Sequence, residues 1–133
     1  MPRNFLLYAD GGSRGNPGEA AFGAVISEDG KVIVELSERI GVATNNVAEY
    51  SGLIAGLRAI HELDPAAEVL ARMDSKLIVE QMSGNWKIKN HEMKKMALMA
   101  RDAHPANLIK YEWIPREMNS HADALVNRAL DYF

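Results

Sequence analysis

The spacing of hydrophobic residues divides the chain into short apolar runs and longer amphipathic stretches. Three runs, at residues 5–9, 20–27 and 31–39, are separated by glycine-containing turns. Short runs bounded by turn residues are typical of strands, and their close succession favours antiparallel pairing. The first third of the chain is therefore predicted to form a three-stranded meander.

Helical spacing begins after residue 46. Residues 47–63 place their apolar side chains on one face, whereas Gly52 and Gly56 lie on another face, where a second backbone can pack closely. Asp64 and Pro65 then end the predicted helix. The remaining pattern predicts a strand at 68–73, helices at 76–82 and 91–103, a strand at 108–114 and a last helix at 121–133. Because the later strands alternate with helices, we predict an α/β fold with a mixed sheet covered by helices.

Composition narrows the class of protein. The 133 residues suit one domain with a real core, residues 1–133, which is either a whole protein or one domain cut from a longer one. The chain has no cysteine, which excludes disulfides and thiolate metal sites. It also has no apolar run of membrane-spanning length and no signal-peptide pattern at its N-terminus, so we expect a cytoplasmic protein without membrane association.

The net charge of −3 counts against a general nucleic-acid-binding protein, which is often basic. A global sum conceals local clusters, however. Lys87, Lys89, Lys94 and Lys95 lie within nine residues and form a basic segment. Acids gathered at a metal site would lower the sum without removing this basic surface.

Four acids occupy the ends of predicted elements. Asp10 follows the first strand and precedes a glycine-rich stretch, Asp74 follows the strand at 68–73, and Glu49 and Asp123 lie near the starts of two helices. If the first and fourth strands are parallel neighbours, Asp10 and Asp74 leave the sheet at the same edge, where ligands gather in α/β sheets.

Each acid also has an ordinary structural interpretation. Asp10 can begin a hairpin turn, and Glu49 can close a capping box with Asn46. Asp74 can cap the following helix, and Asp123 can be a surface acid near a helix N-terminus. Four acids that converge would repel one another and raise their own pKa values unless a cation bound there.

Oxygen ligands without cysteine or a histidine cluster point to Mg²⁺ or Mn²⁺. Two such ions can activate a water and stabilise the leaving oxygen in a phosphoryl displacement. The chain has no nucleophile elbow, catalytic cysteine or P-loop, which disfavours covalent and nucleotide-hydrolysing mechanisms.

Four segments together resemble ribonuclease H of type 1. They are YADGGSRGNPG with Asp10, TNNVAEYSGLIAGL with Glu49, MDSKLIVEQM with Asp74, and NSHADALVNRAL with Asp123, in the family's order. The resemblance implies a ribonuclease H-like five-stranded mixed sheet in the order 3-2-1-4-5, with strand two antiparallel and helices on both faces. It also implies Mg²⁺-dependent endonucleolytic cleavage of the RNA strand of an RNA–DNA hybrid, leaving 5′-phosphate and 3′-hydroxyl ends.

The resemblance also assigns roles to residues. The four acids would ligate two Mg²⁺ ions with substrate bound, with Mn²⁺ as a substitute; Asp10 would bridge the ions, and Glu49 would contact a 2′-hydroxyl of the RNA. Residues expected to contact the hybrid are Gly11, Gly12, Ser13, Arg14, Asn16, Thr44, Asn45 and Asn46. The alternative for these residues is plain turn and cap chemistry.

The chain departs from the family in two places. It lacks the helix and basic loop that many members insert after the segment matching SGNWKIKN; Trp86, Lys87 and Lys89 are expected to replace part of that surface, unless Trp86 is a core anchor. The loop before Asp123 is also short. Other members carry there a mobile histidine that serves proton transfer or product release, and His121 or Arg116 is a candidate for this role, with capping or packing as the alternative for His121.

Three other functions fit part of the pattern: a nuclease of the same fold acting on another nucleic acid, a catalytically weak hybrid-binding module, and a small-molecule phosphatase. The four intact acids disfavour a pure binding module, which would gain from losing negative charge near phosphates. We expect the partner to be an RNA–DNA hybrid and the protein to be a monomer.

Overall fold

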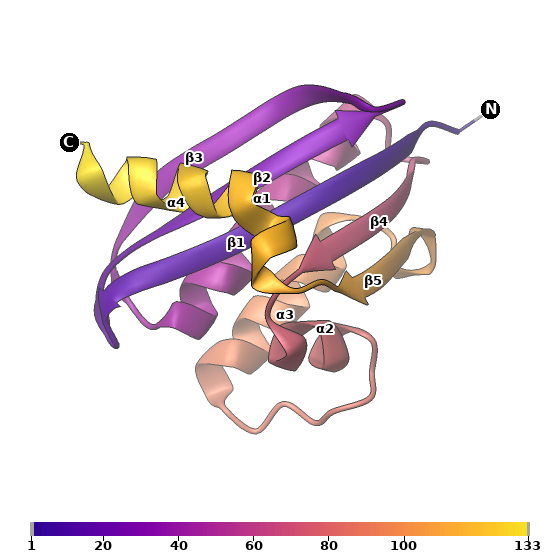
Figure 1. Ribbon diagram of the computed structural model, residues 1–133. Coiled ribbons are helices and arrows are strands. Elements are labelled where there is room, and N and C mark those ends of the chain that lie inside the picture. Colours follow the sequence, from indigo (N-terminus) through magenta and orange to yellow (C-terminus); the bar gives the residue numbers. More distant parts are fainter. Residues whose placement is uncertain (1, 133) are drawn as a thin grey trace.

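The computed structural model describes residues 2–132 and contains a five-stranded sheet with helices on both faces (Figure 1). Its elements are β1 (Asn4–Gly15), β2 (Gly18–Glu28), β3 (Lys31–Ala43), α1 (Asn45–Leu63), β4 (Glu68–Met73), α2 (Lys76–Met82), α3 (His91–Ala103), β5 (Ile109–Trp113) and α4 (Ser120–Asp131), with 3-10 turns at Ala106–Leu108 and Arg116–Asn119. The order β3-β2-β1-β4-β5 is confirmed, in which β2 is antiparallel to β1 and β4 is parallel to β1.

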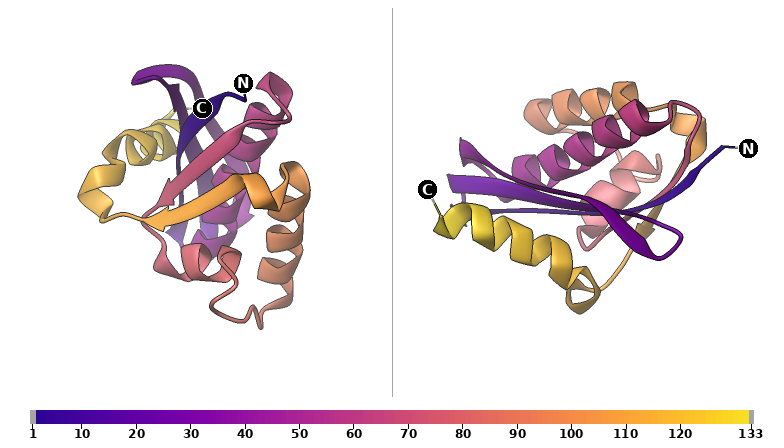
Figure 2. Two further views of the ribbon diagram at one scale, coloured as in Figure 1. Left: turned by 90° about the vertical axis from the view of Figure 1, so that its right-hand side faces the viewer. Right: turned by 90° about the horizontal axis from the view of Figure 1, so that it is seen from above.

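The helices divide between the two faces of the sheet. Figure 2 shows α1 and α3 on one face and α4 on the other. Leu7 of β1 is fully buried together with Leu53 and Leu57 of α1, whereas Leu125 of α4 packs with Val25 of β2. Apolar side chains thus hold α1 and α4 on opposite sides of β1 and β2. No helix within residues 2–132 is long and apolar enough to cross a membrane.

The first strand continues well beyond the predicted end. We expected it to finish at Asp10 and to be followed by a glycine-rich loop, but β1 runs to Gly15 and pairs with β2 continuously from Leu6, opposite Ser27, to Gly15, opposite Gly18. Glycines weaken strands intrinsically, and here the continuous pairing with β2 outweighs that tendency. Asp10 therefore lies within a strand, and the hairpin-turn interpretation of Asp10 and Gly11 is wrong.

Two glycines allow α1 to approach β1 closely. A methyl group at Gly11 would lie 2.1 Å from the carbonyl carbon of Ala48, and one at Gly52 would lie 2.6 Å from the carbonyl oxygen of Asp10. The predicted close approach of a second backbone at Gly52 is confirmed, whereas a methyl group at Gly56 would meet the side chain of Leu7. The contact sets α1, and with it Glu49, directly against the backbone of Asp10.

The helix caps leave two acids without the capping roles considered above. Thr44 caps α1 by accepting a 3.2 Å hydrogen bond from Val47 N–H, so the capping box of Asn46 and Glu49 is wrong. Ser75 caps α2 by accepting from Ile78 N–H, so Asp74 does not cap this helix.

Smaller differences concern the ends of elements. The strand predicted at 108–114 is shorter, and its last residue, Trp113, is 47% exposed. The loop predicted at 115–120 contains the 3-10 turn Arg116–Asn119. The last helix runs from Ser120 to Asp131, and Phe133, the last residue of the predicted helix, lies outside the described residues.

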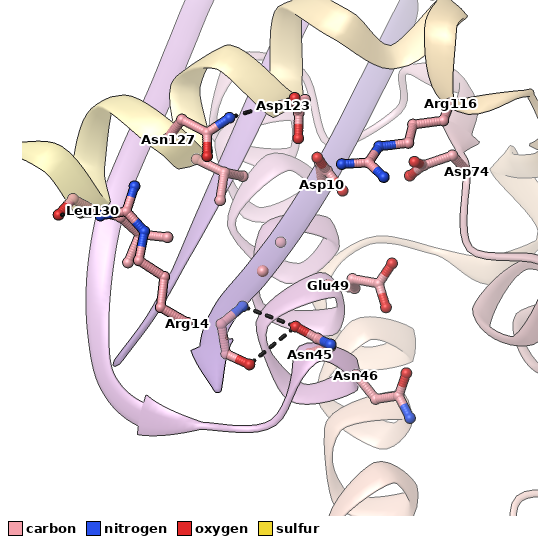
Figure 3. Close-up of a pocket in the computed structure, with 14 residues that line it drawn as sticks. Asp10, Arg14, Asn45, Asn46, Glu49, Asp74, Arg116, Asp123, Asn127 and Leu130 are labelled. Carbon is pink, nitrogen blue, oxygen red and sulfur yellow. Dashed lines mark hydrogen bonds between the residues drawn. The ribbon is translucent and has the colours of Figure 1, made fainter. Parts of the chain in front are cut away.

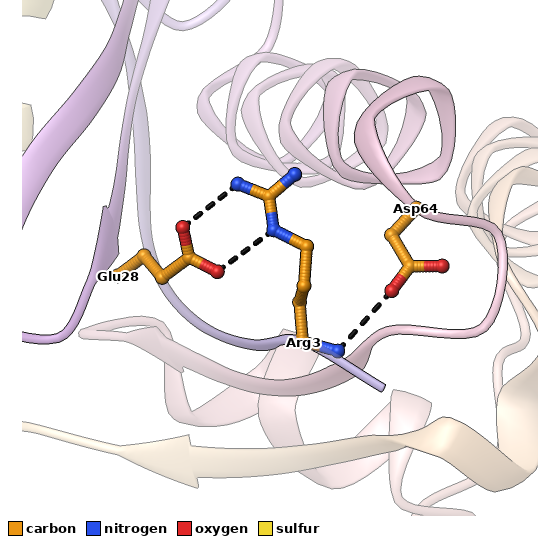
Figure 4. A network of polar contacts seen from close by, with 3 residues as sticks. All are labelled: Arg3, Glu28 and Asp64. Atoms are coloured by element: carbon orange, nitrogen blue, oxygen red, sulfur yellow. Dashed lines mark hydrogen bonds and ion pairs between the residues drawn. The ribbon is translucent and has the colours of Figure 1, made fainter. Parts of the chain in front are cut away.

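A polar network holds the start of β1. Arg3 donates two hydrogen bonds to the Glu28 carboxylate, at 2.8 and 2.7 Å, and its backbone N–H donates to Asp64 at 3.2 Å (Figure 4). The network joins the start of β1 to the end of β2 and to the end of α1. It fixes the end of the sheet opposite to that at which β4 leads into Asp74.

Candidate active site

Two strands and two helices bring acidic residues together at Asp10. Asp10 is only 6% exposed. It lies on β1 just beyond the last residue of that strand that pairs with β4, which is Tyr8, opposite Arg72. Asp74 follows the end of β4, at the corresponding edge, which confirms that the two acids leave the parallel part of the sheet together.

The two remaining acids come from helices on opposite faces. Glu49 lies in the second turn of α1, one turn later than expected because α1 begins at Asn45. Asp123 lies in the first turn of α4 and projects toward Asp10 (Figure 3). The four acids therefore reach one place from β1, α1, the end of β4 and α4.

Three of the acids lie close enough together to hold one cation. One carboxylate oxygen each from Asp10, Glu49 and Asp74 can be chosen so that all three lie within 4.8 Å of one another. Asp123 lines the same cavity, which has a volume of about 480 Å³. We refer to Asp10, Glu49, Asp74 and Asp123 as the carboxylate cluster.

Burial and mutual repulsion oppose full ionisation of the cluster. Burial raises the pKa of Asp10 to about 8, and the negative charge of Asp74 adds to the rise. Smaller contributions come from Glu49 and Asp123, while a hydrogen bond from Gly11 N–H opposes the shift. Burial, followed by the charge of Asp74, also raises the pKa of Glu49 to about 8. A bound divalent cation would relieve this repulsion, and carboxylate oxygens are the ligands that Mg²⁺ and Mn²⁺ prefer.

Most of the residues predicted to contact substrate lie around this cavity. Its lining includes Gly11, Gly12, Ser13, Arg14, Asn45, Asn46 and Arg116. Asn16 and Thr44 support this lining from outside: Asn16 Oδ1 accepts a 3.1 Å hydrogen bond from Asn45 N–H, and Thr44 caps α1.

Asn45 links the β1–β2 hairpin to the start of α1. Its Oδ1 accepts hydrogen bonds from the backbone N–H of Ser13 at 2.8 Å and from the Ser13 hydroxyl at 2.9 Å. These contacts orient the side-chain amide of Asn45 so that its nitrogen points away from β1 (Figure 3). Asn45 lines the cavity, and the two N–H groups of its side-chain amide are not used in the contacts with Ser13.

Arg14 makes an anchoring contact that sequence analysis did not anticipate. Its guanidinium is hydrogen-bonded to the Asp131 carboxylate and to the carbonyl oxygen of Leu130, at the C-terminal end of α4. The contact ties the tip of the hairpin to the helix that carries Asp123.

The predicted basic surface forms a separate groove. Trp86 and Lys87 line it together with Ile88, Lys94, Leu98 and Arg101, and we refer to these six residues as the Trp86 groove. Trp86 is 45% exposed, so its interpretation as a core anchor is wrong. Lys89 is exposed on the same loop.

The two candidates for the mobile histidine's role differ in position. His121 is not among the residues that line the cavity, and it is paired with Glu35 of β3 through Nε2. Arg116 lines the cavity, and Figure 3 shows its side chain extending toward Asp10 and Asp74. Among the other histidines, His104 follows the end of α3, is buried and is hydrogen-bonded to the carbonyl oxygen of Ala67.

Sequence analysis missed two polar residues beside the cluster. Asn127 lines the cavity and donates a 3.4 Å hydrogen bond to Asp123, four residues earlier on α4. Spacing of four residues on a helix is a signal that would have found it. Asn119 is buried and donates to Asp74, a contact that no local pattern indicates.

The sequence of the chain is similar to those of several known proteins. A family model described as reverse transcriptase-like covers residues 8–129. The bifunctional protein Rv2228c of Mycobacterium tuberculosis is 50% identical over 95% of the chain, although the chain spans only 35% of that protein. Ribonuclease HI of Halobacterium salinarum is 41% identical over 93% of the chain and 63% of its own length. Ribonuclease H of Alcanivorax borkumensis is 30% identical over 97% of the chain and 93% of its own length.

The chain belongs to the ribonuclease H family. Solved structures of the family superpose closely. The N-terminal RNase H domain of Rv2228c gives a TM-score of 0.91 at 48% identity, covering 97% of this chain and 94% of that chain. LC11-RNase H1, solved in complex with an RNA/DNA hybrid, gives 0.88 at 40% identity, covering 96% of both chains.

Proposed function

We propose that this ribonuclease H is an endonuclease that hydrolyses the RNA strand of RNA–DNA hybrids and leaves 5′-phosphate and 3′-hydroxyl ends. The observation that carries the proposal is the convergence of Asp10, Glu49 and Asp74 within 4.8 Å in an open cavity that Asp123 also lines. Support for the substrate comes from LC11-RNase H1, a relative 40% identical to this chain whose structure contains an RNA/DNA hybrid.

The four acids are proposed to hold two Mg²⁺ ions when the hybrid is bound, with Mn²⁺ as a substitute. The chemistry supplied by two such ions is activation of a water and stabilisation of the leaving oxygen. The raised pKa values of Asp10 and Glu49 support this role, because these residues gain most from a cation that stabilises their ionised forms. Glu49 is also proposed to contact the 2′-hydroxyl by which a protein distinguishes RNA from DNA.

The lining of the cavity is proposed to position the hybrid. Asn45 accepts hydrogen bonds from Ser13 only at its oxygen, so its amide N–H groups remain for acceptors on the nucleic acid. Gly11 and Gly12 carry no side chain that would keep the RNA backbone away from β1. Asn46 lines the cavity, whereas Asn16 and Thr44 act by holding the start of α1.

Positive charge outside the cluster completes the proposal. The Trp86 groove and Lys89 are proposed to bind the hybrid away from the cleavage point, through stacking on Trp86 and phosphate contacts to Lys87 and Lys89. For proton transfer or product release, Arg116 is favoured over His121 because it lines the cavity. A cytoplasmic monomer stays a prediction.

The test is a cleavage assay with labelled RNA–DNA hybrid, DNA duplex, RNA duplex and a small phosphate ester. We expect cleavage of the hybrid alone, in its RNA strand, with Mg²⁺ or Mn²⁺ and not with Ca²⁺, whose longer and looser coordination would misplace the attacking water. Equal turnover in Ca²⁺, or dependence on zinc with indifference to Mg²⁺, would contradict the two-metal proposal. Tight hybrid binding without cleavage would favour a binding module instead.

A further inference from the structure

Asn119 occupies the cap position of α4 without capping it. Asparagine is favoured at this position because its side-chain oxygen accepts a hydrogen bond from the first turn of the helix. Here the side chain makes no such bond. It turns inward instead, and the residue is 1% exposed.

The amide nitrogen of Asn119 contacts two elements of the carboxylate cluster. Nδ2 donates a 3.2 Å hydrogen bond to Oδ1 of Asp74 and a 3.0 Å hydrogen bond to the carbonyl oxygen of Ala9, the residue before Asp10. Asp123 follows Asn119 by four residues on α4. One side chain therefore connects the segments that carry Asp10, Asp74 and Asp123.

These contacts fix the orientation of the amide. If oxygen and nitrogen were exchanged, Oδ1 would face two acceptors, the Asp74 carboxylate and the Ala9 carbonyl, and both contacts would become repulsive. Oδ1 is buried and has no hydrogen-bond partner among the described residues. A buried polar atom without a partner opposes folding, and such costs concentrate at functional sites.

We propose that Asn119 is a positioning residue of the carboxylate cluster, holding the Asp74 carboxylate in the orientation that receives the cation. This inference rests on the proposed function. Carboxylate ligands are generally held by hydrogen bonds from residues that do not touch the metal, and loss of such a partner costs about 10- to 100-fold in metal affinity or activity. Asparagine donates both hydrogen bonds from one nitrogen. Aspartate at this position would instead add a fifth negative charge to the cluster.

The experiment measures Mn²⁺ affinity directly by calorimetry without nucleic acid, alongside hybrid affinity, thermal melting and the Mg²⁺ dependence of cleavage. Asn119→Ala should weaken Mn²⁺ binding about 10- to 100-fold and raise the Mg²⁺ concentration needed for half-maximal cleavage similarly, with hybrid affinity unchanged. Asn119→Ser keeps one short donor and should fall between wild type and the alanine variant.

His104→Ala is the matched stability control. His104 is also buried and bonded to a backbone carbonyl, that of Ala67, but Ala67 lies just before the start of β4 whereas Asp74 follows its end. This variant should melt at a lower temperature and bind Mn²⁺ like wild type.

The outcomes separate the two proposals. Wild-type Mn²⁺ affinity in folded Asn119→Ala, or in Asn119→Ser if the alanine variant does not fold, would overturn the positioning role while leaving the proposed function intact. An equal loss of Mn²⁺ affinity in His104→Ala would overturn it as well, because stability alone would then explain the effect. Failure of wild type to bind Mn²⁺ and to cleave hybrid would overturn the proposed function and this inference with it.

Discussion

The carboxylate cluster and the Trp86 groove are proposed to serve one substrate, yet the fold holds them in different ways. The four acids come from separate elements and are buried or half-buried. Trp86, Lys87 and Lys89 are exposed and lie within four residues of one loop. Every distance in the carboxylate cluster depends on tertiary packing. The three loop residues are instead neighbours in the sequence, although the groove is completed by Lys94, Leu98 and Arg101 of α3.

The difference has an electrostatic consequence. Buried carboxylates raise their own pKa values, so the cluster is costly without a cation and is suited to bind one. Exposed lysines are screened by water and salt, and each contributes little to the stability of the protein. Substitutions in the cluster should therefore change chemistry, and substitutions in the groove should change affinity.

The largest expected effect is that of Asp10→Asn. Asparagine keeps the shape of aspartate but lacks its charge, and one of its two terminal atoms is a donor that cannot ligate a cation. Turnover should fall at least about 100-fold, the loss seen when one transition-state stabiliser is removed. Hybrid affinity should persist or increase, because one negative charge facing the phosphates is gone.

The measurement combines thermal melting, hybrid affinity and single-turnover rate on the same preparation. Asp29→Asn, in the exposed β2–β3 turn, is the matched control and should behave like wild type. If Asp10→Asn instead melts at a lower temperature and loses activity only in proportion to unfolded protein, Asp10 is a structural residue.

Much of this site was predictable because acids at element ends are visible in the sequence. The periodicity located every helix and strand, and the order of the sheet followed from the family resemblance. The continuation of β1 past Asp10 was not predictable from its glycines, because it depends on pairing with β2. The contact of Arg14 with Asp131 of α4 joins residues 117 positions apart, and that of Asn119 with Asp74 joins residues 45 positions apart. No local sequence pattern indicates contacts between residues so distant in the chain.

The placement of His121 follows from helical geometry. Residues two apart on a helix do not share a face, because successive side chains are rotated by about 100°. With Asp123 facing the cavity, His121 had to point elsewhere, and it meets Glu35. Arg116 precedes α4, in the 3-10 turn Arg116–Asn119, and its position at the cavity could not be predicted from helical geometry.

A second, smaller effect concerns the stability of the cluster without metal. Asp10 and Glu49 have pKa values raised to about 8 in the folded protein, so between about pH 4 and pH 8 the folded state binds more protons than the unfolded state. Stability therefore falls as pH rises through this window. In EDTA, the melting temperature should fall from pH 6 to pH 8.5 by at least roughly 4 °C, the shift that about 1 kcal/mol produces in a domain of this size.

Two comparisons assign this pH effect to the cluster. Added Mg²⁺ should reduce the fall, because the cation binds the ionised carboxylates. Asp10→Asn should show a shallower pH dependence than wild type, and the difference between the two proteins removes the contribution of the histidines. A melting temperature that rises from pH 6 to pH 8.5 in EDTA, with the same slope in Asp10→Asn, would show that the acids are not repelling one another.

The smallest expected effect is that of replacing Lys87 and Lys89 together with alanine. Each lysine that contacts a phosphate contributes roughly one unit to the slope of log affinity against log salt, so the slope should fall by about two. KM should rise with little change in kcat, because phosphate contacts away from the cleavage point stabilise ground and transition states alike. The control is the double variant Lys31→Ala/Lys110→Ala, which removes the same two charges from exposed positions on β3 and β5. If both double variants change KM and slope equally, the effect is one of net charge, and the Trp86 groove does not touch the hybrid.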